Sequence, residues 1–434
     1  MENNMIENYL KEVCSYIKNK DVHKDISDEI GNHISEIVDE CIDEGFEEVE
    51  AINKAIKRIG SAYECGIKLN KLHRAKPDMT TIILAIVLAT IGIVTMYSMG
   101  ENSSVVYISS FNNIIGLIIG GIIGVGIYFF DYRKLKKYSY HIYWLSIAIL
   151  TISLMKTNLF HIIKIGDFSI SEVSIHLSAV ILILISLSGV INIKSINNKT
   201  DLILIGSMGI IPLIIFYGTS DVTIGLVYLC GINIIFLSSK VSKSLKKSLM
   251  YIETIFIILS LLLLLREPYR IGRVYSLVNP TRDPMGDGYT INRIRYLLSN
   301  VTLFGNKISI EELEIGDVKS HFALIYIIYN FGVIFGGMCI SAIIIFVARI
   351  FNIMNKVKDS YGRMLVLSIG YVFLVQTIIN LLSNLGIMGI YTSLPFICFG
   401  SIDYIISISM VGLICSIYRR RDVRDRVIVN RFRI

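Results

Sequence analysis

Charged residues are scarce in this chain of 434 residues, of which they make up only 18%. Soluble domains usually contain about 25% charged residues, so the shortage argues against a soluble enzyme. The seven cysteines form no C-x-x-C pair and no metal-ligand spacing, and we expect neither disulfides nor a zinc site. The first residues are polar and acidic, with no basic region and no cleavage site, which predicts no cleavable signal peptide.

Apolar residues, in contrast, make up 53% of the chain and occur in runs near twenty residues long. A helix of about this length crosses the hydrocarbon core of a bilayer. The sequence therefore predicts an all-α fold, a polytopic membrane protein with ten transmembrane helices. The ten spans lie at roughly 79–99, 113–130, 138–155, 173–193, 202–218, 222–239, 248–265, 322–349, 364–386 and 397–417.

Lysine and arginine gather in alternate loops between these spans. Four occur in each of the loops 131–137, 240–247 and 349–363, and none occurs in 100–112, 219–221 or 387–396. Cytoplasmic loops of membrane proteins hold the excess of these residues. The pattern therefore predicts a multi-pass protein whose N- and C-termini are both cytoplasmic.

The predicted external loop at 266–321 departs from this pattern, because it carries eight Lys and Arg residues. Loops of this length are uncommon in compact domains unless they are functional or disordered. The loop also concentrates Gly, Pro and Asp, which favours a functional surface for anions over a solvated excursion.

Residues 1–76 differ in composition from the rest. Up to residue 78 the chain has 11 Lys and Arg against 17 Asp and Glu, whereas the remainder has a net charge of +13. Apolar residues recur at helical spacing, for example at Ile26, Ile30 and Ile34. The segment resembles the small permease-prefix domain of bacterial membrane proteins, which implies a cytosolic helical module for regulation or interaction. A helical cap without a ligand is the alternative.

Three glycines in the second predicted span, Gly116, Gly120 and Gly124, are four residues apart and share one helix face. Small residues at this spacing let two helix backbones approach closely. We expect them to pack against a helix of the same chain rather than to form a dimer interface.

The run Asp283-Pro284-Met285-Gly286-Asp287-Gly288-Tyr289 lies in the long loop after the seventh predicted span. It resembles the signature loop of the SEDS family (shape, elongation, division and sporulation), the FtsW/RodA/SpoVE-like membrane proteins. Weaker similarities occur at Ser171-Glu172, Ser220-Asp221 and Leu394-Pro395-Phe396. The resemblance covers about residues 79–420. The predicted domains are the prefix 1–76, the membrane domain 77–420 and a basic cytoplasmic tail at 421–434.

This resemblance implies peptidoglycan synthesis at the bacterial cell membrane, in which lipid II is polymerised into glycan strands for cell shape, division or sporulation. The implied partners are lipid II or another undecaprenyl-linked precursor, a class b penicillin-binding protein and the lipid bilayer, with no nucleic acid. Cations stabilise a leaving diphosphate, and the fork of an arginine matches phosphate oxygens. We therefore expect the substrate to be bound by Arg270, Arg273, Arg282, Asp283 and Glu172.

The family's essential carboxylate lies at the start of the eighth span, in a His-Thr-Asp-Phe run. The matching run here is Lys319-Ser320-His321-Phe322, so that His321 occupies the aspartate position. Imidazole is a competent base near neutral pH, and Asp317, one helical turn upstream, is the second candidate. Three functions stay open: a glycosyltransferase, a catalytically degenerate scaffold or regulator of a cell-wall synthase, and a flippase for lipid-linked precursors. The pattern assigns no metal ligand and leaves any cofactor open.

Overall fold

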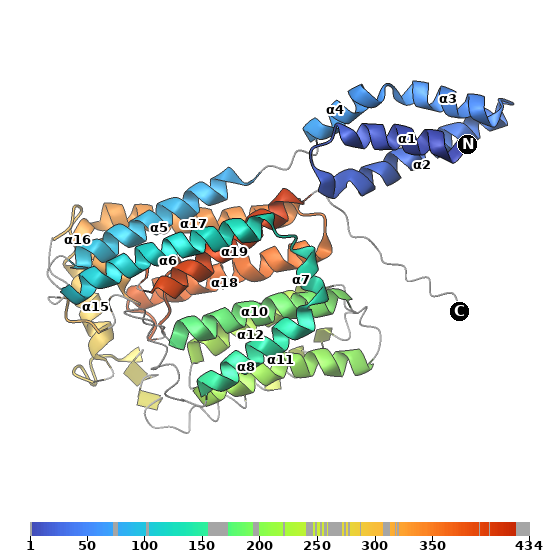
Figure 1. Ribbon diagram of the computed structural model, residues 1–434. Helices are drawn as coiled ribbons and strands as arrows, with labels where there is room; N and C mark the ends of the chain where they lie inside the picture. Colours follow the sequence, from blue (N-terminus) through green and yellow to red (C-terminus); the bar gives the residue numbers. More distant parts are fainter. Residues whose placement is uncertain are drawn as a thin grey trace. The chain divides into compact units, whose positions relative to one another are not determined.

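In a computed structural model of the protein, the regular elements of the described residues are all helices (Figure 1). The predicted all-α class is therefore confirmed. The structure describes residues 2–72, 77–100, 104–154, 172–193, 199–219, 222–239, 278–286, 288–306, 313–316, 318, 321–389, 391–398 and 400–421, with scattered positions between 246 and 276.

The chain forms two compact units. The first contains residues 1–77 together with two short pieces, 356–360 and 417–434, and the second contains 78–355 and 361–416. The second unit, called the membrane domain below, carries the apolar helices.

The prefix folds into four α-helices around its own apolar core. They are α1 (Glu2–Ser15), α2 (His23–Asp43), α3 (Glu48–Ile59) and α4 (Ala62–Leu72), with a short 3-10 helix η1 (Lys20–Val22) before α2. Val13, Ile34 and Ala55 are fully buried in that core, because the apolar residues of each helix share one face. The Tyr9 hydroxyl also donates to the Gly60 carbonyl at 2.9 Å.

The helices of the membrane domain follow most of the predicted spans. Within the part of the chain that the structure describes, six are long and apolar enough to cross a bilayer: α5 (Met79–Gly100), α6 (Ser104–Phe129), α10 (Glu172–Ile193), α17 (Val333–Lys356), α18 (Ser360–Asn384) and α19 (Ser401–Arg419). Three shorter apolar helices are α8 (Ser139–Leu154), α11 (Lys199–Thr219) and α12 (Val222–Ser238). The predicted span 248–265 lies outside the described residues except for scattered positions, so the count of ten stays a prediction.

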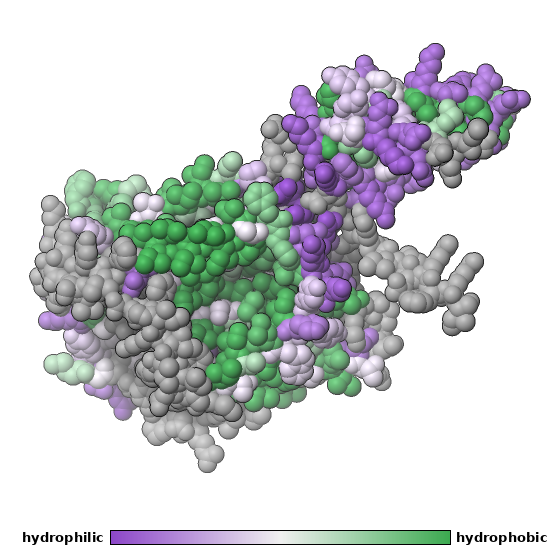
Figure 2. All heavy atoms as spheres, in the orientation of Figure 1, coloured by the Kyte–Doolittle hydropathy of each residue, from purple (hydrophilic) through white to green (hydrophobic). Residues whose placement is uncertain are grey.

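Large apolar side chains cover the outside of this domain, as a membrane requires. On α5 and α6, Ile83, Ile118 and Ile122 are 58%, 57% and 70% exposed. Figure 2 shows this apolar surface over α5 and α6, whereas hydrophilic residues cover most of the prefix. Helices that expose such side chains are stable where lipid covers them.

The predicted span 322–349 is wrong as a single helix. It consists of α16 (Ala323–Phe331) and α17, separated at Gly332, which has φ 96° and ψ 163°. Residues 302–306 fill the break: Val333 N–H donates to the Thr302 carbonyl at 3.1 Å. A Cβ on Gly332 would lie 2.2 Å from the Leu303 carbonyl oxygen, so only glycine fits there.

The three spaced glycines of α6 pack against α19 of the same chain, which confirms the prediction of internal packing. A Cβ added to Gly116 would lie 2.5 Å from the Ser401 carbonyl oxygen, and one on Gly120 would lie 3.0 Å from the Ile405 Cα. Their neighbour Gly121 has nothing within 4 Å of such an atom. The glycine face therefore allows α6 and α19 to approach at backbone distance.

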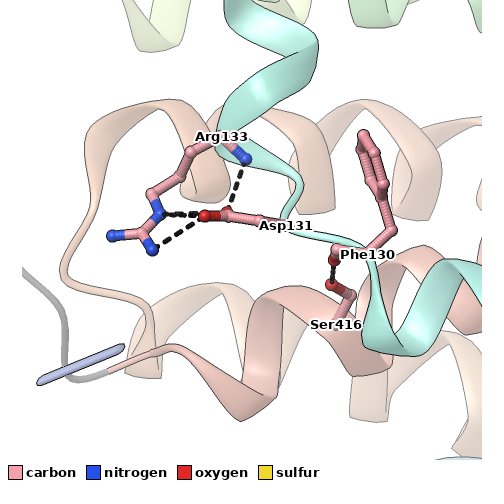
Figure 3. Close-up of polar contacts among 4 residues, drawn as sticks. All are labelled: Phe130, Asp131, Arg133 and Ser416. Carbon is pink, nitrogen blue, oxygen red and sulfur yellow. Dashed lines mark hydrogen bonds and ion pairs between the residues drawn. The ribbon is translucent and has the colours of Figure 1, made fainter. Parts of the chain in front are cut away.

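The end of the membrane domain where α5 begins, called the Asp78 end, is held by polar contacts. Asp78 forms an ion pair with Arg349 of α17, and Arg349 Nε donates to Asp78 Oδ2 at 3.0 Å. Nearby, Arg133 at the start of α7 (Arg133–Lys137) donates to the Asp131 carboxylate at 2.8–3.1 Å, and Ser416 donates to the Phe130 carbonyl at 2.6 Å (Figure 3). The first contact joins the start of α5 to α17, and the last joins the end of α6 to α19.

Candidate functional site

The opposite end of the membrane domain, called the His321 end, contains the predicted catalytic position. His321 lies two residues before α16 and is half-buried. Its carbonyl oxygen accepts hydrogen bonds from two side-chain amides of α18, Asn380 Nδ2 at 3.0 Å and Asn384 Nδ2 at 3.1 Å. The chain is therefore fixed at His321 by a helix 59 to 63 residues further along the sequence.

The imidazole ring of His321 lies against an aromatic residue from another segment. It stacks on Tyr391 with 6.3 Å between ring centroids and 25° between planes. Phe322 meets the same tyrosine edge to face, at 5.0 Å. Because Tyr391 contacts both rings, it restricts the directions in which His321 can point.

Tyr391 begins a non-helical segment, 391–398, that is buried inside the membrane domain. Residues 392–398 are all buried, and Phe396 has a left-handed φ of 64°. A Cβ on Gly92 of α5 would lie 2.1 Å from the Phe396 carbonyl oxygen, so the two backbones touch. Irregular backbone at membrane depth is tolerated where protein surrounds it, as it is here.

The residue pattern of the signature loop, residues 283–289, is explained by a tight turn. Asp283 Oδ1 accepts a hydrogen bond from the Gly286 N–H at 3.1 Å, and a Cβ on Gly286 would lie 2.2 Å from Asp283 Oδ2. A Cβ on Gly288 would lie 2.0 Å from the Pro280 carbonyl oxygen. The Asp-Pro-x-Gly-x-Gly run therefore builds the turn that starts helix α15 (Tyr289–Ser299).

Arginines attach α15 to neighbouring segments. Arg295 donates from Nε and Nη2 to the Gly386 carbonyl, just after α18, at 3.3 and 3.2 Å. Arg293 donates to the Leu313 carbonyl at 2.9 Å and pairs with Glu314 at 3.3 Å. Because Gly386 follows Asn384 by two residues, the end of α18 holds both α15 and His321.

The structure places the predicted substrate-binding residues as follows. Arg282 and Asp283 are exposed, with the Arg282 guanidinium 5.5 Å from the centre of the Tyr275 ring. Glu172 is the first residue of α10, and its side chain is outside the description. Arg270, Arg273 and Asp317 lie outside the described residues. Among the described residues, no three His, Cys, Asp or Glu side chains gather as a metal site would require.

The asparagine pair and Tyr391 were not among the residues predicted for the site. The available signal was the spacing of Gln376, Asn380 and Asn384, which places three amides on one face of a helix that is mostly apolar. All three are buried. Polar residues inside a span are costly and usually face the interior, which makes this face of α18 a candidate for function.

The sequence matches the family described as cell cycle protein, of FtsW, RodA and SpoVE, over residues 78–423. The chain belongs to this family. A relative named probable peptidoglycan glycosyltransferase FtsW, from Buchnera aphidicola subsp. Acyrthosiphon pisum, is 33% identical over 194 residues, 43% of this chain and 47% of that protein. The matched region spans about half the length of such curated relatives.

Solved structures of the FtsW/RodA/SpoVE family share the fold. A chain from a peptidoglycan synthase complex, studied for its coordination of polymerisation and crosslinking, superposes with a TM-score of 0.63 at 16% identity, covering 80% of this chain and 98% of that one. The rod shape determining protein RodA of Thermus thermophilus gives 0.56 at 15% identity, covering 81% and 99%. The protein is thus a multi-pass membrane protein with a RodA-like fold.

Proposed function

We propose that the protein polymerises lipid II into glycan strands at its His321 end, with that end facing outward from a bacterial cell membrane. The observation that carries the proposal is the placement of His321, held at the start of α16 and joined through the end of α18 to the signature loop. Membership of the family and the names of its relatives, which include peptidoglycan glycosyltransferases, support it.

The reaction requires a base and a stabilised leaving group. The 4-hydroxyl of one sugar attacks the anomeric carbon of another, a new C–O bond forms, and the bond to undecaprenyl diphosphate breaks. His321 takes the proton of the attacking hydroxyl, since a neutral imidazole is a competent general base. Asp317 is the second candidate for this role.

Cations compensate the charge that develops on the departing diphosphate. Arg270, Arg273 and Arg282 fill this role in the proposal, because a guanidinium forms two parallel hydrogen bonds to phosphate oxygens. Glu172, at the start of α10, binds the sugar part of the substrate. Asp283 contributes by holding the turn that presents Arg282, through its bond to Gly286.

A class b penicillin-binding protein is the proposed partner, and it crosslinks the strands that this chain makes. The likeness to a chain of a peptidoglycan synthase complex supports such a partner. We propose that the prefix 1–76 and the tail 421–434 lie in the cytoplasm, where the acidic prefix regulates the membrane domain or contacts another protein.

A scaffold without activity is the second candidate, and one observation favours it. The span that follows the aspartate run ends in Glu-x-x-Gly in the family, whereas here it reads Tyr329-Asn330-Phe331-Gly332, so that Tyr329 occupies the glutamate position. The family's carboxylate is thus replaced by a phenol, and the next residue, Asn330, packs α16 on α5 by donating to the Ser98 and Tyr326 hydroxyls at 3.3 and 3.0 Å.

The test is glycan polymerisation by the purified full-length protein in lipid vesicles with lipid II, with and without the partner. Slow polymerisation that disappears in His321→Ala, and persists in the control His33→Ala in the prefix, is the expected result. Polymerisation that survives His321→Ala assigns the base elsewhere. No polymerisation in any mixture, with lipid II still bound, leaves the scaffold as the function.

A further inference from the structure

We propose that Asn380 and Asn384 are positioning residues for His321, and that they set the place of the base without touching the substrate. The inference rests on the proposed function, since it concerns how that base is held. Two residues of α18 thereby join the site as positioning residues, beside the two candidates for the base, His321 and Asp317.

The two amides converge on one acceptor. Asn380 Nδ2 and Asn384 Nδ2 lie 3.0 and 3.1 Å from the His321 carbonyl oxygen, so both lone pairs of this carbonyl are directed to the same helix. His321 precedes the N-cap residue Phe322 and makes no turn of α16 itself. Its position is therefore fixed by side chains of α18 rather than by helix geometry.

Asn384, a residue of α18, also caps the N-terminus of α16. Its Oδ1 accepts a hydrogen bond from the Ile325 backbone N–H at 3.0 Å, which satisfies one of the free donors in the first turn. Phe322 has no side-chain group for this purpose. One amide thus holds the residue before the helix and the first turn of the helix at the same time.

Asn380 ties the same point to the segment that carries Tyr391. Its Nδ2 donates to the Thr392 carbonyl at 2.7 Å, and its Oδ1 accepts from Asn384 Nδ2 at 3.0 Å. Since Tyr391 stacks on the His321 ring, the pair sets both the backbone of His321 and the partner of its imidazole. Three segments of the site meet at these two amides.

The amide groups of Asn380 and Asn384 do more than fill space in the core. Both residues are 1% exposed, on a helix in which leucine would fill the same space without polar groups to satisfy. Their hydrogen bonds hold the His321 backbone in one position. Displacement of a reacting group by 1 Å can cost about 10²-fold in rate. A positioning role therefore affects kcat and leaves binding of lipid II unchanged.

The first measurement compares Asn384→Leu, Asn384→Asp and Thr377→Val by polymerisation kinetics. Asn384→Leu should lower kcat about 10²-fold with KM for lipid II within about twofold. Asn384→Asp keeps the acceptor for Ile325 but loses the donor to His321, and should be equally impaired. Thr377→Val is the control, because the Thr377 hydroxyl bonds only within α18, to Phe373, among the contacts described.

The second measurement needs no activity. In His321→Cys the carbonyl and its two amide donors remain, so the thiol should react slowly with a maleimide. Adding Asn384→Leu should raise that rate at least fivefold, in a background where exposed Cys230 and half-buried Cys14 and Cys65 are serine.

These outcomes separate the two ideas. Unchanged thiol reactivity overturns the positioning role, whether or not the protein polymerises. Increased reactivity in a protein that makes no glycan supports the positioning role and rejects the proposed function. A kcat of Asn384→Leu equal to that of wild type, in an active protein, also overturns the positioning role.

Discussion

Removing the carboxylate of Asp78 should destabilise the membrane domain more than any single exposed charge would. The side chains of Asp78 and Arg349 are 4% and 24% exposed, and Asp78 also accepts from the Thr81 N–H at 3.2 Å. Breaking a buried ion pair by removing one partner typically costs about 3–5 kcal/mol. Arg349 retains some exposure and can direct its head group toward water, so we expect Asp78→Ala to cost about 3 kcal/mol.

The assay is SDS-induced unfolding in mixed micelles, with a double-mutant cycle of Asp78→Ala and Arg349→Leu. The double variant should lose about 2 kcal/mol less than the sum of the single variants, because the second change removes the charge left without its carboxylate. Thr81→Val, which removes a single donor hydroxyl, should cost about 1 kcal/mol. A loss below about 1 kcal/mol for Asp78→Ala, or strict additivity, would refute this reasoning.

The same pair predicts a dependence on pH. Burial of Asp78 opposes ionisation, but hydrogen bonds from Arg349 and Thr81 outweigh it and lower the pKa of the carboxyl below its ordinary value. A carboxyl with a lowered folded pKa contributes stability above its unfolded pKa, which is about 3.9. This contribution should therefore be constant near neutral pH and disappear only as the pH falls below about 4. Asp78→Asn should remove this loss of stability at acid pH.

Three further outcomes are expected. Gly116→Val should cost about 1–3 kcal/mol in the same unfolding assay because its Cβ meets the Ser401 carbonyl, whereas Gly121→Val, which faces open space, should be nearly neutral. His321→Asp should raise glycan polymerisation about 10²–10³-fold by restoring a charged base, and no increase would mean that the rest of the site is inactive. Ser103→Cys should react with an impermeant maleimide in intact cells, and reaction only after permeabilisation would reverse the proposed orientation.

The helices were predictable because their signals are local. Nine of the ten predicted spans coincide with apolar helices among the described residues, although the span 322–349 is broken at Gly332. The spacing of Gly116, Gly120 and Gly124 predicted a helix contact. The break at Gly332 was not predictable from hydropathy, since Phe331 and Val333 continue the apolar run. Its cause is the backbone of Leu303, 29 residues earlier, which approaches too closely for a side chain at Gly332.

The site was only partly predictable. The resemblance identified the position of His321, because a short run around it can be aligned. It could not identify Asn384, whose partners across the site are backbone groups of His321 and Ile325, so the side chains of these two residues do not reveal the contact. Substrate binding by Arg282 and Asp283 stays a prediction, and the structure adds a local reason for Asp283, Gly286 and Gly288, the turn before α15.

The buried segment 391–398 constrains how the protein can be assembled during synthesis. Its backbone is not helical, so it cannot enter lipid alone, where unpaired N–H and C=O groups have no partner. It needs a protein surface already in place, and Gly92 and Phe373 supply that surface from α5 and α18, made earlier on the ribosome. Helix α19 follows this segment and packs on the glycines of α6. Insertion of the carboxyl-terminal part therefore has to wait until the earlier helices have gathered.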